Sequence, residues 1–244
     1  MNLILLENGE MNADGVAVVR DGRAAHMRKV LRAGPGARMR VGIADGAVGT
    51  GEVVSVSAAG VVLRCTLSGP PPPRPPVDLL LAMPRPKVMK RLWAQLAAMG
   101  VGRVLVTNAE KVERMYFDTH VLEPGFVRER LVEGLQQACD TRLPEVTVHR
   151  RLKILVEDEL DGLCPGRHRI VADPSFDRPV AAALAGREVR RVLLAVGPEG
   201  GWTPYELELL ARHGFAGAGM GPRILRADTA CIALLAQAQA AMGG

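Results

Sequence analysis

A run of prolines divides the sequence into two parts with different residue patterns. Residues 69–76 read Gly-Pro-Pro-Pro-Pro-Arg-Pro-Pro. Proline lacks a backbone N–H and fixes φ, so this run can enter neither a helix nor a central strand, and it favours extended polyproline. We expect a stiff spacer at 70–76 between domains at 1–69 and 77–244. The alternative for this run is a ligand of a proline-recognition domain.

Before the spacer, short runs rich in β-branched residues alternate with turns. Asp21-Gly22, Asp45-Gly46 and Ala59-Gly60 are the expected turns. Closely spaced short strands of this kind predict a small β-barrel. The expected strands are 16–19, 37–41, 51–56 and 61–67, and one short helix is expected at about 24–31.

After the spacer, strand-like and helix-like segments alternate. Val88, Leu92, Leu96 and Met99 recur at helical spacing, and Gly100 stands where a helix commonly ends. Strands that alternate with helices predict an α/β domain with a mostly parallel sheet. The expected strands are 79–83, 103–107, 169–172 and 191–196, with another helix at 126–139.

Composition permits a nucleic-acid partner without establishing one. The 244 residues carry a net charge of +5 and are 48% hydrophobic but only 3% aromatic, so the core must be mainly aliphatic. Arginine predominates among the 31 basic residues and suits bidentate phosphate contacts. A GC-rich genome accounts equally well for a chain rich in Ala, Gly, Pro and Arg.

Several functional classes lose support from the sequence. The four cysteines include no CxxC pair, so we expect no metal site and a reduced, cytoplasmic protein. Leu3–Leu6 is too short for the apolar region of a signal peptide, and no apolar run approaches the ~20 residues of a membrane span, so no membrane partner is expected. The G-x-G-x-x-G and G-x-x-x-x-G-K-[ST] patterns of nucleotide sites are absent.

Two glycine-rich segments near the C-terminus are the best candidates for a binding site. Gly197-Pro198-Glu199-Gly200-Gly201 follows an apolar run, and residues 220–230, Met-Gly-Pro-Arg-Ile-Leu-Arg-Ala-Asp-Thr-Ala, lead into an apolar helix. Each reads as a strand that ends in a tight turn and leads into a helix. Such loops can line one crevice at the carboxyl ends of parallel strands. An ordinary strand-to-helix turn is the alternative for the first segment.

Helix start signals follow both segments. Thr203 is the expected N-cap of the first helix, with Pro204 at the first helical position and Glu206 completing a capping box. Asp228 or Thr229 is the expected cap of the last helix.

These segments resemble the bacterial 16S ribosomal RNA uridine N3-methyltransferases of the SPOUT superfamily. The family's usual ending LRTETA corresponds to LRADTA at residues 225–230. Its HxxxVLR segment and the glycines that follow are similar to residues 26–36, and Asp45-Gly46 fits the next turn. The resemblance covers nearly the whole chain in order and spacing.

The resemblance implies a fold and an activity. Residues 1–69 would form a PUA-like β-barrel that binds RNA, and residues 77–244 a SPOUT-type α/β domain with a trefoil knot. The knotted loops of the family bind S-adenosylmethionine, and its members are homodimers that methylate one uridine of 16S rRNA at N3. The cofactor-binding residues implied here are Ala172, Asp173, Val196, Gly197, Pro198, Glu199, Gly200, Gly201, Met220, Gly221, Ile224 and Leu225.

Arg226 is the candidate catalytic residue. Uracil N3 carries a proton and is a poor nucleophile until that proton leaves, so a cation that stabilises the uracil anion would assist methylation. A phosphate contact or a structural ion pair is the alternative for Arg226. Glu199 is expected to accept hydrogen bonds either from the cofactor or from neighbouring backbone. Neither loop contains a histidine, so no general base is identified.

Basic residues of the N-terminal part are the candidates for RNA contacts. Four of them lie close to one side of the expected short helix, and Arg142 falls in a stretch that the family often conserves as E-Q-x-G-R-x-R-x-P. A solvated helix on which His26 packs locally is the alternative. The candidate RNA-binding residues are His26, Arg28, Lys29, Arg32 and Arg142.

The chain departs from the family pattern outside the glycine loops. These departures leave the RNA target open, so an RNA methyltransferase with another target and a non-catalytic ribosome-assembly factor remain alternatives. The positions where family residues are replaced are Gln95, Ala98, Gln136, Cys139, Asp140 and Asp228.

Overall fold

A computed structural model describes residues 2–185 and 189–243 of the chain. The chain divides into two compact units. Unit 1 comprises Met1–Arg74 and Val132–Leu143, and unit 2 comprises Pro75–Leu131 and Pro144–Gly244. The division near residue 74 falls inside the proline run, whereas the return of 132–143 to unit 1 is a feature that the sequence pattern did not indicate.

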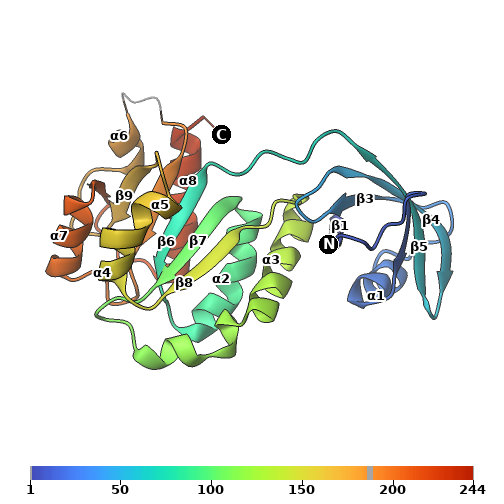
Figure 1. Ribbon diagram of the computed structural model, residues 1–244, viewed down its shortest axis with the longest axis horizontal. Helices are drawn as coiled ribbons and strands as arrows, with labels where there is room; N and C mark the ends of the chain where they lie inside the picture. Colours follow the sequence, from blue (N-terminus) through green and yellow to red (C-terminus); the bar gives the residue numbers. More distant parts are fainter. Residues whose placement is uncertain (1, 186–188, 244) are drawn as a thin grey trace. The chain divides into compact units, whose positions relative to one another are not determined.

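Unit 1 is built on a five-stranded sheet in the part of the chain that the structure describes, in the order β1-β3-β4-β5-β2 (Figure 1). β1 runs parallel to β3, and the other neighbours are antiparallel. The four expected strands are present with bounds shifted by a few residues, and β1 is an addition. The strands are β1 Ile4–Leu6, β2 Val16–Val19, β3 Arg38–Ile43, β4 Val48–Ser57 and β5 Gly60–Ser68.

One helix, α1 (Gly22–Lys29), closes the core of unit 1. Its N-cap is Asp21, whose carboxylate accepts from the backbone N–H of Arg23 at 2.9 Å. Ala24 and Met27 are buried within the apolar cluster formed by the strands. The short helix expected at about 24–31 is therefore present, beginning two residues earlier.

Residues 132–143 complete unit 1 through backbone contacts. They include the C-terminal part of α3 (Pro124–Ala138). The carbonyl of Gln136 accepts from the N–H groups of Asn2 and Leu3, both at 3.0 Å. Thr141 accepts through its carbonyl from Asp45 N–H at 2.8 Å, and its hydroxyl donates to the carbonyl of Gly46 at 2.7 Å. This segment thus ties the first strand and the β3–β4 turn together.

Unit 2 contains a six-stranded sheet among the described residues, and all its strands are parallel. This confirms the predicted α/β fold with a parallel sheet. β6 and β10 are buried throughout, as expected for strands covered on both faces. The sheet order is β11-β9-β10-β6-β7-β8, with β6 Val77–Ala82, β7 Val101–Thr107, β8 Glu145–His149, β9 His168–Ala172, β10 Val192–Val196 and β11 Phe215–Ala218.

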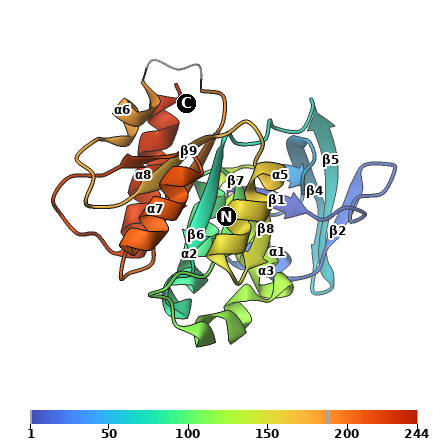
Figure 2. The ribbon, with the colours of Figure 1, turned by 60° about the vertical axis from the view of Figure 1, so that its left-hand side comes forward.

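Helices cover both faces of this sheet. α2 and α8 pack against each other and against the central strands, and Figures 1 and 2 show α4, α5 and α7 on the opposite face. α2 ends as expected, with Gly100 in the left-handed conformation at φ +69°. The helices are α2 Pro86–Ala98, α4 Leu152–Ile154, α5 Leu160–Leu163, α6 Val180–Leu184, α7 Pro204–Arg212 and α8 Ala227–Ala241, with short helical turns at Arg114–Asp118, His120–Leu122 and Leu155–Glu159.

The proline run enters neither helix nor strand, as predicted. Within unit 1, the carbonyl of Pro72 accepts from Nε of Arg142. Within unit 2, the carbonyl of Pro76 accepts from the N–H of Val192 at 3.0 Å, directly before β10 pairs with β6. Each end of the run is therefore held by its own unit. No helix among the described residues is long and apolar enough to span a bilayer.

Candidate functional site: a pocket at the ends of three parallel strands

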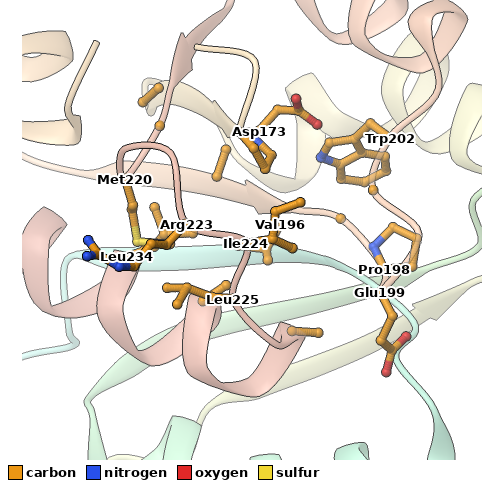
Figure 3. Close-up of a pocket in the computed structure, with 18 of the residues that line it drawn as sticks. Asp173, Val196, Pro198, Glu199, Trp202, Met220, Arg223, Ile224, Leu225 and Leu234 are labelled. Atoms are coloured by element: carbon orange, nitrogen blue, oxygen red, sulfur yellow. The ribbon is translucent and has the colours of Figure 1, made fainter. Parts of the chain in front are cut away.

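A pocket of about 290 Å³ lies where β9, β10 and β11 end (Figure 3). The two glycine-rich segments both line it, which confirms the predicted shared crevice. β9 lies between β10 and β11 in the sheet, so its C-terminal residues complete the pocket. The lining residues are Ala172–Pro174, Val196–Trp202, Ala218–Gly221, Arg223–Leu225, Ala227, Ala230 and Leu234, which include every residue predicted to bind the cofactor.

The first glycine segment forms a tight turn after β10. The N–H of Gly201 donates to the carbonyl of Pro198 at 2.8 Å, and Gly201 adopts φ +68°. A β-carbon at Gly197 would lie 3.2 Å from Nε1 of Trp202, so glycine allows the strand end to approach the indole. The turn therefore places backbone and the Trp202 ring at one wall of the pocket.

The helix after this turn begins as predicted. Thr203 is the N-cap of α7 and Glu206 completes the capping box: Thr203 N–H donates to Oε2 of Glu206 at 2.8 Å. The other carboxylate oxygen of the buried Glu206 accepts from the N–H of Glu110 at 2.7 Å. One side chain thus fixes both the start of α7 and the loop that follows β7.

Neighbouring loops hold the glycine segment from its outer side. Oε1 of Glu199 accepts from the N–H of Arg85, the N-cap of α2, at 3.0 Å. Nζ of Lys111 donates to the carbonyl of Gly200 at 2.7 Å. Of the two roles expected for Glu199, the structure shows the contact with neighbouring backbone.

The second glycine segment follows β11. Gly219 packs so closely that a β-carbon there would lie 1.9 Å from the carbonyl oxygen of Phe176. Gly221 has φ +87° with open space at its β-carbon position. Ile224 and Leu225 line the pocket although Ile224 is 83% exposed. The segment is therefore anchored at its start and open to solvent near its end.

The expected cap of the last helix is wrong. α8 begins at Ala227 with Arg226 as its N-cap, and no side chain makes the capping hydrogen bond. Asp228 lies inside the first turn, where its Oδ1 accepts from Thr229 N–H at 3.0 Å. The chain enters the helix earlier than either capping residue because Arg226 is the last residue with extended backbone.

Arg226 lies next to the pocket but not among its lining residues. Its side chain is 73% exposed, and its Nε lies 3.8 Å from Oδ1 of Asp228. Oδ2 of Asp228 accepts from Nη2 of Arg91, on α2, at 3.1 Å. Partial burial raises the pKa of Asp228, but hydrogen bonds from Thr229 N–H and Arg91 outweigh it, so the net pKa is lowered. One carboxylate thus holds two guanidinium groups beside the pocket.

The predicted RNA-binding residues of unit 1 differ in how they are engaged. Arg28 donates to the carbonyl of Ser57 at 2.6 Å, and Arg142 donates to the carbonyls of Pro72 and Asp45. Nε2 of His26 is buried with no hydrogen-bond partner among the described residues. Only Lys29 and Arg32 of this predicted set are classed as exposed.

Some lining residues were not predicted from the sequence. Trp202 directly follows the glycine segment, and Leu234 lies two helical turns into α8. The apolar helical spacing of Ala227, Ala230 and Leu234 was a usable signal for the α8 contribution. The described residues contain no group of three or more His, Cys, Asp or Glu side chains placed to hold a metal ion.

Comparisons with known proteins agree with this site. The RNA methyltransferase domain model matches residues 71–239. The ribosomal RNA small subunit methyltransferase E of Treponema pallidum is 29% identical, with 98% of this chain and 92% of that protein covered. The protein of the same name from Mycobacterium bovis is 28% identical over 90% of this chain and 84% of its own length.

Two solved structures share the fold over almost the full length. The ribosomal RNA small subunit methyltransferase E from Neisseria gonorrhoeae, bound to S-adenosyl methionine, has a TM-score of 0.78 at 18% identity, covering 98% of this chain and 97% of its own. A putative methyltransferase from Legionella pneumophila, in complex with the same cofactor, has a TM-score of 0.76 at 23% identity, with 99% and 98% covered. Because the domain model matches more than half of the sequence, the chain belongs to the family of proteins with an RNA methyltransferase domain.

Proposed function

We propose that the chain transfers the methyl group of S-adenosylmethionine to N3 of a uridine in the 16S rRNA of the small ribosomal subunit. The observation that carries this proposal is the pocket, which gathers every residue predicted to hold the methyl donor. The names of the relatives support small-subunit rRNA as the substrate, and two similar structures contain the methyl donor. The family resemblance supports the uridine and its N3 atom.

The residues of the pocket fit this methyl donor. Its size is at the lower end of the usual range for small-molecule sites, about 300–1,000 Å³. Val196, Ile224, Leu225 and Leu234 offer apolar surface for a purine ring, and the glycine loops present backbone N–H and C=O groups for its polar edges. The indole N–H of Trp202 is buried there without a partner among the described residues. The bound donor supplies a methyl group on a positively charged sulfur.

Arg226 is proposed to act on the uracil. Its exposed guanidinium lies at the start of α8, directly after the lining residue Leu225. A positive charge beside uracil favours loss of the N3 proton, because it stabilises the anion that forms. Asp228 restrains Arg226 and Arg91 from one side, and the backbone of α8 fixes the position of both. The chain thus holds a cation in place before the substrate arrives.

The family resemblance also supports proposals about assembly and fold. We propose that unit 1 is a PUA-like barrel that contacts RNA, with Lys29 and Arg32 as its exposed cations. The loops around the pocket are proposed to form the trefoil knot, and the protein to act as a cytoplasmic homodimer. The exposed apolar side chains of Ile224 and Leu225 beside the pocket support a second copy nearby.

A labelled-methyl assay tests the proposed reaction. Purified protein is incubated with methyl-labelled S-adenosylmethionine and small ribosomal subunits from a strain that lacks the enzyme. We expect labelled N3-methyluridine at one position, located by mass spectrometry of nuclease fragments. Absence of label, under conditions where a related enzyme modifies the same subunits, would contradict the proposal.

A related RNA target is the second candidate. It is favoured by Arg142, whose side chain is engaged by the carbonyls of Pro72 and Asp45, and by the departures at Cys139 and Asp140. The same mass spectrometry separates the two: label on a different nucleotide or a different RNA supports this candidate. Binding of S-adenosylmethionine measured by calorimetry would disfavour a non-catalytic assembly factor.

A further inference from the structure

Trp202 presents an unusual polar group to the pocket. It directly follows the glycine segment, lines the pocket and is only 4% exposed. Its indole nitrogen, Nε1, has no hydrogen-bond partner among the described residues. An indole N–H can only donate, and a buried donor without an acceptor is costly and rare in folded proteins. The position of this N–H therefore requires an explanation.

The other tryptophan of the chain shows the usual arrangement. Trp93 lies on α2 and is completely buried, and its Nε1 donates to the carbonyl of Val121 at 2.9 Å. Buried tryptophans commonly find such a partner. The two indoles of one fold thus differ: Trp93 is satisfied by backbone, whereas Trp202 keeps its donor for something outside the described residues.

The surroundings of Trp202 leave its N–H accessible from the pocket. A β-carbon at Gly197 would lie 3.2 Å from Nε1 and 3.3 Å from two ring carbons, so a larger residue there would crowd this edge. Figure 3 shows the indole nitrogen on the side of the ring toward Asp173 and Val196. Oδ1 of Asp173 already accepts from the N–H and the hydroxyl of Ser175, at 2.9 and 2.7 Å. Glycine at 197 therefore keeps the donor uncovered.

We propose that Trp202 is a ligand-binding residue whose indole N–H donates a hydrogen bond to an acceptor atom of the bound methyl donor. This inference rests on the proposed function, because it takes S-adenosylmethionine and its product S-adenosylhomocysteine as the ligands. The glycine turn before Trp202 then has two roles: its backbone lines the pocket, and its lack of a side chain at Gly197 exposes the indole.

NMR of the indole groups tests the hydrogen bond directly. Protein labelled with ¹⁵N-tryptophan has two indole signals, because Trp93 and Trp202 are its only tryptophans. Trp93→Phe assigns them. On saturation with S-adenosylhomocysteine, we expect the Trp202 indole proton to move downfield and to exchange with solvent more slowly, whereas the Trp93 signal stays in place.

A conservative substitution gives the energetic measure. Trp202→Phe keeps an aromatic ring but removes the N–H, and we expect calorimetry to show about 3- to 10-fold weaker binding of S-adenosylhomocysteine. Trp93→Phe removes the same group outside the pocket and should leave the affinity within a factor of two, which we take as roughly the error of such comparisons. Circular dichroism of both variants verifies that each is folded.

The outcomes separate this inference from the proposed function. If S-adenosylhomocysteine binds but the Trp202 proton neither shifts nor exchanges more slowly, and Trp202→Phe binds as tightly as the unchanged protein, the inference is wrong and the proposed function stands. If neither S-adenosylmethionine nor S-adenosylhomocysteine binds to the unchanged protein, the proposed function itself is contradicted.

Discussion

Arg226 differs from most arginines of this chain in how little its guanidinium is engaged. It is 73% exposed, and its nearest carboxylate oxygen, on Asp228, lies at 3.8 Å. By contrast, Arg23 has two carboxylate partners at 2.6 Å. An arginine that is held in place but not neutralised is suited to a charge that develops on a substrate. The residue-scale evidence therefore favours substrate contact over a structural ion pair.

Replacement of Arg226 should separate catalysis from cofactor binding. We expect Arg226→Ala to lower the rate of methyl transfer by about 100- to 1,000-fold, the usual loss for one charge-stabilising group. Affinity for S-adenosylmethionine should change little, because Arg226 does not line the pocket. Single-turnover kinetics and calorimetry measure the two quantities. Arg212→Ala, at an exposed position on α7, is the control. Equal losses of rate and affinity would assign Arg226 to folding or cofactor binding.

Cys139 occupies a backbone conformation that favours glycine. Its φ is +60°, and the N–H of Asp140 donates to the carbonyl of Leu135 at 3.1 Å, the bond typical of a helix closed by a left-handed residue. The related family commonly has glycine at this position. We expect Cys139→Gly to raise the free energy of unfolding by about 0.5–1 kcal/mol, because relief of the left-handed strain exceeds the entropy cost of glycine.

Chemical denaturation of Cys139→Gly beside Cys139→Ala tests the cause. Alanine removes the thiol but keeps a β-carbon, so it should give no comparable gain. If alanine stabilises as much as glycine, the thiol and not the backbone conformation is responsible.

At the scale of elements, α1 of unit 1 is held by a cluster of charges. Arg23 on α1 bonds to Glu10 and to Asp21, both at 2.6 Å, and its side chain is largely buried. Partial burial raises the pKa of Glu10, but Arg23 and the Glu7 N–H lower it more, to below 4.5. Hydrogen bonds from Arg23 lower the pKa of Asp21 below 3.8. The cluster therefore stabilises the folded state only while both carboxyls are ionised.

This cluster predicts a pH dependence of stability. Because both folded-state pKa values are lowered, the stabilisation is complete above about pH 5 and is lost as the pH falls through those values. We expect Arg23→Gln to lower the free energy of unfolding by about 2 kcal/mol at pH 7, and by much less at pH 3. Urea denaturation at the two pH values measures the difference. A loss of equal size at both would show that packing of the arginine stem, not its charge, matters.

The sequence indicated elements with strong local signals and missed those that depend on distant partners. The capping box at Thr203 and Glu206 is local, and it is present. β1 is three buried residues, too short to show any periodicity, and β11 carries a glycine that weakens its strand pattern. The cap expected at Asp228 was wrong because a good capping residue type does not by itself determine where a helix begins.

The same reasoning applies to the site. Both glycine segments are local strand–turn–helix units, so their shared position at the strand ends could be predicted. The partners of Glu199 and Asp228, namely Arg85 and Arg91, come from α2 and its N-cap, more than a hundred residues earlier in the chain. Such contacts leave no local signature in the sequence. The free donor of Trp202 likewise becomes visible only when all its neighbours are placed.

At the scale of the whole molecule, each unit has a core of its own, and the pocket belongs to unit 2 alone. A ligand that binds the folded pocket stabilises the unit that contains it. We expect S-adenosylhomocysteine at 100 times its Kd to stabilise unit 2 by about 2.7 kcal/mol. Differential scanning calorimetry should show the transition of unit 2 moving to higher temperature while that of unit 1 stays in place. Equal movement of all the heat absorption would show that the units unfold as one.

Unit 1 is discontinuous in sequence, and this has a consequence for synthesis on the ribosome. The N–H groups of Asn2 and Leu3 wait for the carbonyl of Gln136, and the turn at Asp45 waits for Thr141. At about 5–20 residues per second, the ribosome adds these partners several seconds after residue 74. The first-made unit therefore cannot be the first one finished. Until residue 143 has left the exit tunnel, the nascent chain carries an unsealed sheet whose earliest strand has the greatest need of a chaperone.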